Sequence, residues 1–168
     1  MPPGLQYFSA LSLVIPHEFY TGFRSQHPAA DLFNSALNYG YGMLYHEVES
    51  AIMRAGLDPY IGIIHADRGG NVSFVYDFIE QFRQPIVDRA VITLFTRHQM
   101  VQSDADESYY LIGTGKQKVI GAVAGRLVER IEYRGRSLSY RQVMQEKARE
   151  YARFLNEGSE FVPFIHRW

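Results

Sequence analysis

One long stripe of apolar side chains constrains this chain more than any other feature of its sequence. Within residues 32–55, apolar side chains recur at spacings of three and four, which places them on one face of an α-helix. The members of the stripe are Leu37, Tyr41, Leu44, Val48 and Ile52. Asp31 stands where a helix N-cap is expected, and Gly56 followed by Pro59 is typical of a helix end. A helix with one fully apolar face must be covered by other elements, so the chain needs a core built around it.

Helical patterns also dominate the rest of the chain. An apolar stripe at helical spacing covers residues 74–82 and stops before Pro85, where a third helix is expected to begin. Two more helices are predicted over residues 116–133 and 139–155, the last between a serine N-cap and a glycine stop. No series of alternating apolar and polar residues indicates a sheet. The sequence therefore predicts an all-α fold.

The composition is that of one globular domain spanning residues 1–168. Of these residues 46% are apolar and 21% are charged. The absence of cysteine excludes disulfides, thiolate zinc sites and thiol nucleophiles. No apolar run reaches the roughly 18 residues of a membrane span. A secretory signal begins with basic residues, whereas the first Lys or Arg of this sequence is Arg24. We therefore expect a cytoplasmic protein that makes no membrane contact.

A net charge of -1 conceals a strongly basic final third. Residues 116–153 hold ten Lys and Arg residues against four Glu residues, a local excess of six positive charges. Guanidinium groups suit bidentate contacts to phosphate, so a polyanionic partner is one explanation. The other is a solvated helix face held by local pairs, such as Glu146 with Arg149 and Glu150 with Arg153. Charge alone leaves both explanations open.

Three short motifs that would assign a chemistry lack their key residues. Gln117 stands where a phosphate-binding loop needs Ser or Thr, and Ser50 stands where a zinc-protease helix needs its second His. Tyr109 replaces the turn glycine of a calcium loop beside Asp104 and Asp106. A nucleotide-binding loop, zinc proteolysis and a calcium loop are therefore excluded.

A scattered set of acids and one histidine remains. Glu49 lies at the edge of the first stripe and Asp77 at the edge of the second, and neither has a cation three or four residues later. Glu80 has Arg83 for an ion pair, and His65 lies between the two stripes. A half-buried carboxylate without a partner shifts its pKa, finds a distant Arg or binds a metal. Taken singly, each of these residues also has a purely structural explanation, so spacing alone predicts no metal site.

The order of several short segments matches a known family. They are residues 37–41 (Leu-Asn-Tyr-Gly-Tyr), 44–45 (Leu-Tyr), Glu49, 55–59 (Ala-Gly-Leu-Asp-Pro), 61–62 (Ile-Gly), His65, 73–77 (Ser-Phe-Val-Tyr-Asp), Glu80 and 82–83 (Phe-Arg). With this series the chain resembles the catalytic domain of the CRISPR-associated adaptation endonuclease/integrase. That protein is the first of the two core adaptation proteins and inserts new spacers into CRISPR arrays. The likeness runs from Tyr7 to residues 164–168 and covers nearly the whole chain.

The resemblance implies a metal site. In the family, a Glu on the long helix, the His after the glycine turn and the Asp of the next helix bind one divalent metal. These positions are Glu49, His65 and Asp77 here, and Glu80 falls where the family has a further carboxylate that assists the site. Two carboxylates and an imidazole suit Mg²⁺ or Mn²⁺. The implied function is a metal-dependent DNA endonuclease/integrase that inserts spacers by phosphodiester transesterification.

The resemblance also implies partners. They are DNA, as prespacer and CRISPR repeat, and the second core adaptation protein. The candidate DNA-binding residues are Arg126, Arg130, Arg134, Arg136 and Arg141. Arg126 and Arg130 are expected to share one helical face. Family members form homodimers through an N-terminal β-rich domain that this sequence lacks, so we expect a monomer or weak dimer with slow single-site cleavage and no paired insertion.

Two other classes of function stay open. One is a non-catalytic helical DNA-binding or scaffold domain derived from the same family. The other is a plain helical interaction module. Metal-dependent nicking of branched DNA would exclude the first, and a failure to bind DNA at low salt would favour the second.

Overall fold

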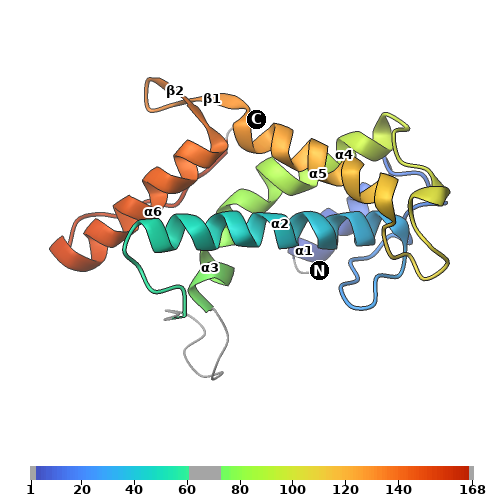
Figure 1. The fold of residues 1–168 in the computed structure, drawn as a ribbon, viewed down its shortest axis with the longest axis horizontal. Coiled ribbons are helices and arrows are strands. Elements are labelled where there is room, and N and C mark those ends of the chain that lie inside the picture. Colours follow the sequence, from blue (N-terminus) through green and yellow to red (C-terminus); the bar gives the residue numbers. More distant parts are fainter. Residues whose placement is uncertain (1–2, 61–72, 167–168) are drawn as a thin grey trace. The chain divides into compact units, whose positions relative to one another are not determined.

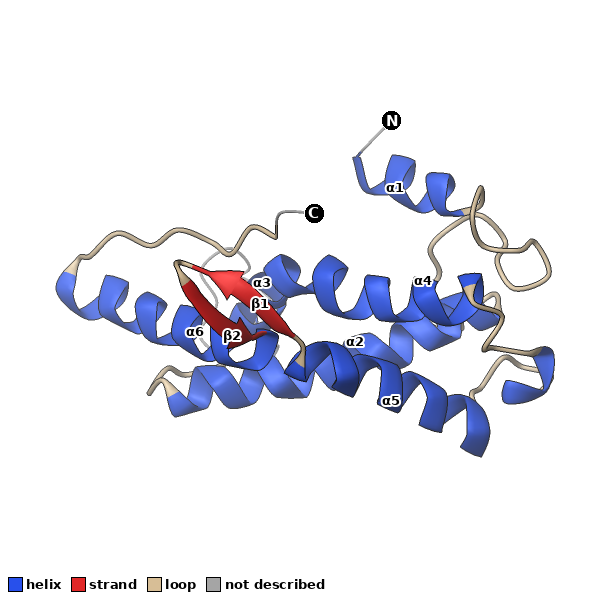
Figure 2. Ribbon diagram, turned by 90° about the horizontal axis from the view of Figure 1, so that it is seen from above, coloured by secondary structure: helices blue, strands red, loops and turns tan. Residues whose placement is uncertain are grey.

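The computed structural model describes residues 3–60 and 73–166, and helices dominate them (Figure 1; Figure 2). The α-helices are α1 (Pro3–Leu11), α2 (Leu32–Arg54), α3 (Ser73–Phe82), α4 (Arg89–Thr96), α5 (Gly113–Val128) and α6 (Tyr140–Glu157). The other elements are a π-helical turn η1 (Arg83–Asp88), a 3-10 turn η2 (Gln102–Asp104) and the strands β1 (Arg130–Tyr133) and β2 (Arg136–Ser139). The prediction of an all-α fold is confirmed, and a two-stranded hairpin is the only sheet in the described residues.

Helix α2 forms where the apolar stripe predicts it. Leu37, Leu44, Val48 and Ile52 are fully buried, so the predicted face does meet the core. The Asp31 carboxylate accepts the backbone N–H of residue 34 at 2.7 Å, which satisfies one of the free donors of the first helical turn. Local capping and periodicity together are sufficient to define this helix.

The helix after residue 73 does not stop before Pro85. Helices α3 and α4 are joined by η1, which contains this proline, so the backbone stays helical from Ser73 to Thr96. The expected break was wrong. A proline cannot donate to the carbonyl four residues earlier and its ring crowds that carbonyl, and a wider π turn accommodates both effects.

Residues 116–133 are not one helix. Helix α5 starts earlier, at Gly113, and ends at Val128, and the chain then forms the antiparallel pair β1 and β2. The turn between the strands consists of Arg134 (φ 50°) and Gly135 (φ 74°). Two positive φ angles in a two-residue loop are typical of a type I′ hairpin turn.

Helix α6 confirms its predicted caps. Ser139 accepts the backbone N–H of Gln142, and the Gln142 side chain accepts the backbone N–H of Ser139 in return, which completes a capping box. At the other end Gly158 has a φ of 65°, the left-handed conformation that ends many helices.

The chain divides into two compact units. They are Met1–Gly42 with Val87–Ala124, and Met43–Ile86 with Gly125–Trp168. In the first unit the buried ring of Phe33 meets Tyr20 and Phe95 edge to face. In the second unit Phe82 stacks on Phe164 with ring centroids 5.3 Å apart. The prediction of one domain over residues 1–168 stays a prediction, and all the candidate site carboxylates belong to the second unit.

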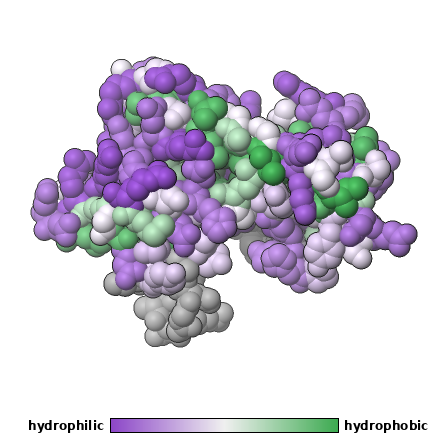
Figure 3. Space-filling view, in the orientation of Figure 1, coloured by the Kyte–Doolittle hydropathy of each residue, from purple (hydrophilic) through white to green (hydrophobic). Residues whose placement is uncertain are grey.

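Hydrophilic residues cover much of the face shown in Figure 3, and apolar residues gather there in separate patches. Phe154 and Leu155 are among the large apolar residues that α6 exposes near its end. None of the helices that the structure describes combines the length and apolar character needed to cross a membrane.

Candidate active site

Glu49 places one carboxylate at the edge of the second unit. Its side chain is 23% exposed, and its Oε2 lies 3.6 Å from Nδ1 of His46. His46 precedes Glu49 by one helical turn, so it is not among the residues three and four positions after Glu49. The carboxylate is therefore half-buried beside a largely exposed imidazole.

Helix α3 contributes the next two carboxylates. Asp77 is half-buried, and its Oδ2 atom is shielded from solvent. Glu80 is exposed and pairs with Arg83 at 2.5 Å, which confirms the predicted pair. Asp77 thus faces inward, and Glu80 lies at the outer edge of the same helix.

Two tyrosines bring the helices of Glu49 and Asp77 together. The ring of Tyr45, one turn before Glu49, lies 5.4 Å from that of Tyr76, the residue before Asp77. Burial and then the negative charge of Glu49 raise the pKa of Tyr45. The stretch of α2 that carries Glu49 therefore packs beside the stretch of α3 that carries Asp77 (Figure 1).

The third predicted metal ligand, His65, lies outside the described residues. Within residues 3–60 and 73–166, no three His, Asp or Glu side chains are arranged to hold a metal ion. The set of Glu49, His65 and Asp77, with Glu80 beside it, stays a prediction. Two carboxylates on adjacent helices do supply the hard oxygen donors that Mg²⁺ and Mn²⁺ prefer, so the described residues fit such an ion.

A further residue, Tyr151 of α6, packs against the turn of α3 that precedes Asp77. Its ring stacks on Phe74, three residues before Asp77, with centroids 4.7 Å apart and an interplanar angle of 29°. Burial and then the charge of Asp77 raise the pKa of Tyr151. Nothing in the sequence links these two positions, because neither local spacing nor a motif connects α3 with α6.

Two of the five candidate DNA-binding arginines make contacts inside the second unit. Arg126 is 14% exposed and donates to the carbonyl of Pro85, to the hydroxyl of Tyr140 and to Glu129. Arg130 lies on β1, where its guanidinium donates to Ser137. The expectation that Arg126 and Arg130 share a helical face was wrong, because α5 ends between them.

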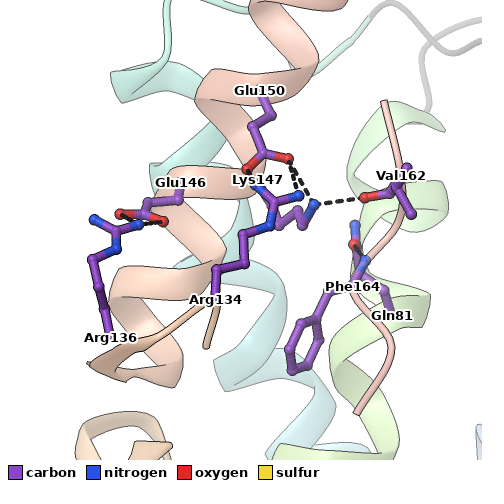
Figure 4. Close-up of polar contacts among 8 residues, drawn as sticks. All are labelled: Gln81, Arg134, Arg136, Glu146, Lys147, Glu150, Val162 and Phe164. Carbon is purple, nitrogen blue, oxygen red and sulfur yellow. Dashed lines mark hydrogen bonds and ion pairs between the residues drawn. The ribbon is translucent and has the colours of Figure 1, made fainter. Parts of the chain in front are cut away.

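The other three candidates hold specific carboxylates. Arg134 pairs with Glu150 at 2.6 Å and Arg136 with Glu146 at 2.7 Å, both across from the hairpin to α6 (Figure 4). Arg141 pairs with Glu47 at 2.6 Å. These arginines would have to exchange a carboxylate for a phosphate to bind DNA.

These pairs replace Glu146–Arg149 and Glu150–Arg153, the local pairs named in one of the two explanations of the basic third. Glu146 and Glu150 take hairpin arginines, so Arg149 and Arg153 make no ion pair with any residue that the structure describes. Both are exposed, and their spacing of four places them on one face of α6. DNA binding stays a prediction for all five candidates, Arg126, Arg130, Arg134, Arg136 and Arg141. Arg149 and Arg153 of α6 could contact a phosphate without first leaving a carboxylate.

Solved structures share this helical fold. A solved structure titled "Casposase bound to integration product" is 32% identical and matches 95% of this chain and 49% of its own, with a TM-score of 0.85. The structure of TM1797, a CAS1 protein from Thermotoga maritima, shares the fold at 24% identity, with a TM-score of 0.83 over 90% of this chain and 49% of its own. The fold is thus the one shared by Cas1 proteins and a casposase.

The sequence identifies the family within this class. Residues 5–124 match the family described as "CRISPR associated protein Cas1", and the chain belongs to that family. CRISPR-associated endonuclease Cas1 1 of Methanospirillum hungatei JF-1 is 37% identical over 96% of this chain, and that of Archaeoglobus fulgidus is 35% identical over 96%. The chain spans about half the length of these relatives, 49% and 50% respectively. The resemblance drawn from the short segments is confirmed.

Proposed function

We propose that this chain is a metal-dependent DNA endonuclease/integrase domain that acts at the adaptation stage of CRISPR defence, where it inserts new spacers by phosphodiester transesterification. One observation carries the proposal: in a member of the Cas1 family, Glu49 and Asp77 lie half-buried on helices that Tyr45 and Tyr76 hold side by side. The names of the curated relatives, which are endonucleases, support the same activity.

Glu49, His65 and Asp77 would hold one Mg²⁺ or Mn²⁺ ion, with Glu80 assisting. When bound, such an ion neutralises charge on the phosphate and orients the attacking oxygen of water or of a DNA 3′-hydroxyl. The side chains of this chain provide the frame. The contact of Tyr45 with Tyr76 fixes the spacing of the two helices, and the Arg83 pair keeps Glu80 outside the buried part.

DNA and the second core adaptation protein are the proposed partners. The solved casposase is bound to an integration product, and a further structure that shares the fold is titled "Cas6-RT-Cas1--Cas2 complex". Arg149 and Arg153 are suited to phosphate contacts because they are exposed and carry no ion pair within the described structure. Members of the family form homodimers, and for this chain alone the proposal keeps the expectation of a monomer or weak dimer.

The test is a Mn²⁺ titration coupled to cleavage and strand transfer on branched DNA, with and without the second adaptation protein. Glu49→Gln and Asp77→Asn should each abolish turnover and weaken Mn²⁺ binding, because each removes a ligand. Glu80→Gln should reduce both less, because Glu80 is already engaged by Arg83. If the chain bound DNA but neither cleaved nor joined it in the presence of any divalent metal, the proposal would be overturned in favour of a scaffold domain. Full turnover in Asp77→Asn would overturn the assigned ligands.

A further inference from the structure

Helices α2 and α6 of the second unit pack side by side and run in the same direction (Figure 2). The Arg141 guanidinium donates to the Glu47 carboxylate at 2.6 and 2.9 Å. The side-chain amide of Gln145 donates to the Ala51 carbonyl at 3.2 Å. These two contacts are four residues apart on each helix, so successive turns of α2 meet successive turns of α6.

One turn beyond these contacts, each helix exposes an arginine. Arg54 follows Ala51 by three residues on α2, and it is the basic residue in the last turn of that helix. Arg149 follows Gln145 by four residues on α6, and both arginines are exposed. Residues spaced by three or four are neighbours on one side of a helix, so the two arginines continue the line along which α2 meets α6. Two positive charges therefore lie side by side on adjacent helices.

Nearby carboxylates are engaged elsewhere. Those of the neighbouring turns pair with other arginines, two of them with the hairpin (Figure 4). They are Glu47, Glu146 and Glu150. Asp58, four residues after Arg54, accepts the backbone N–H of Tyr60 instead. Within residues 3–60 and 73–166, Arg54 and Arg149 consequently form no ion pair, and neighbouring like charges without a counter-charge attract an anion.

The chemistry of the two side chains favours a phosphate as that anion. A guanidinium group presents parallel N–H donors whose spacing matches the oxygens of a phosphate, and it keeps its charge at any physiological pH. A phosphate in a nucleic-acid backbone has two free oxygens, so guanidinium groups from two helices can bind the same phosphate. The arginines of the hairpin would first have to leave their carboxylates, whereas Arg54 and Arg149 have none to leave.

We propose that Arg54 and Arg149 form a clamp in which two guanidinium groups, one from α2 and one from α6, bind the same phosphate of a DNA strand. This inference rests on the proposed function, which makes DNA the substrate. Arg54 follows Glu49 by five residues, a rise of about 7.5 Å along α2. A strand held by the clamp therefore passes close to the candidate metal ligand. Both arginines are positioning residues, and neither touches the metal or the reacting atoms in this scheme.

The test measures DNA binding by Arg54→Gln, by Arg149→Gln and by the double variant. A fluorescent branched duplex is titrated in EDTA at several salt concentrations, so that neither metal nor turnover contributes. Either arginine alone still neutralises the shared phosphate, so each single variant should keep the salt slope of the wild type. The double variant should lose about 0.9 of that slope, the value of one duplex phosphate contact. Arg149→Gln is used rather than Arg149→Glu, because the introduced carboxylate would also engage Arg54.

The matched control removes two charges from the first unit. Arg97 and Lys116 are exposed and form no ion pair in the described part of the chain. Arg97→Gln combined with Lys116→Gln changes the net charge by the same amount as the double variant, and it should leave the salt slope unchanged. An equal loss of slope in this control would overturn the clamp, because the effect would then report net charge alone.

Two other results would also count against the clamp. A loss of about 0.9 in each single variant and about 1.8 in the double variant would mean that the arginines bind separate phosphates. An unchanged slope in the double variant, with a lower melting temperature in Arg54→Gln, would mean that Arg54 only stabilises the end of α2 through the helix dipole. Either result leaves the proposed function intact if the wild-type chain cleaves DNA with Mn²⁺. The predicted slopes without cleavage by the wild-type chain would support the clamp and overturn the proposed function.

Discussion

Replacing Lys147 with methionine removes a buried charge while keeping most of the side-chain volume. The ammonium group has two partners, Glu150 at 2.7 Å and the Val162 carbonyl at 2.6 Å. Breaking a buried ion pair usually costs about 3–5 kcal/mol, because a charge is left without compensation. Glu150 keeps Arg134 at 2.6 Å, so that larger cost does not apply here. What remains is the hydrogen bond from the ammonium group to the Val162 carbonyl, and losing a hydrogen bond to a charged group costs about 1.5–3 kcal/mol.

We therefore expect Lys147→Met to lower the free energy of unfolding by about 2 kcal/mol. At about 2–4 °C per kcal/mol for a domain of this size, the melting temperature should fall by about 4–8 °C. Urea unfolding followed by circular dichroism gives the free energy, and a thermal scan gives the temperature. The matched control is Arg136→Met, which breaks a pair whose side chains are 57% and 26% exposed. Exposed pairs contribute about 0–1 kcal/mol. A Lys147→Met variant as stable as this control would refute the view that the lysine anchors the segment after α6.

Three other outcomes follow from the structure. Gly115→Ala should lower the melting temperature, because its Cβ would lie 2.2 Å from the Asp104 carbonyl oxygen. In the matched control Gly121→Ala the Cβ meets nothing within 4 Å, so the free energy of unfolding should rise by about 0.5–1 kcal/mol. Equal melting temperatures in the two variants would contradict the predicted clash at Gly115. Arg149→Glu with Arg153→Glu should weaken DNA binding at all sequences and reduce the salt slope by about 1.8, while an unchanged slope would show that this face of α6 makes no phosphate contact. Burial alone would raise the pKa of Asp104, but hydrogen bonds from the Lys118 side chain, the Val101 backbone and the Thr114 side chain lower this pKa overall. Its contribution to stability is thus present above its unfolded pKa of about 3.9 and is lost as pH falls through the lower folded value, so Asp104→Asn should flatten the acid end of the stability profile measured by urea unfolding.

Local signals predicted the parts of the fold that depend on neighbours in sequence. Helices α2 and α6 were found because periodicity and capping residues lie within a few positions of each other. The hairpin was missed because its strands are four residues long and its turn places Arg134, rather than Asn or Asp, at the first positive φ. The helix through Pro85 was missed because a π turn overrides a rule that holds for ordinary helices.

The same distinction between local and long-range features applies to the candidate site. The carboxylates Glu49 and Asp77 were found through a family resemblance, and periodicity placed both at the edges of buried faces. Sequence spacing reveals only ion pairs within one helical turn. The ion pairs of Glu146 and Glu150 with the hairpin arginines Arg136 and Arg134 were therefore not predictable. Tyr151 stacks on Phe74, one turn before Asp77, only because α6 and α3 pack together, a relation that one sequence does not encode locally.

The anchoring of Phe164 on α3 has a consequence for the order in which the second unit folds. Gln81 and Phe164 are 83 residues apart in the chain, so their contact closes a long loop and costs entropy before it contributes any stability. Helices such as α2 and α6 form from nearby residues and are fast by comparison. We expect the aromatic stack of Phe82 and Phe164 to form after the helices, which makes it a late event in folding. Substitutions there should then accelerate unfolding far more than they slow refolding.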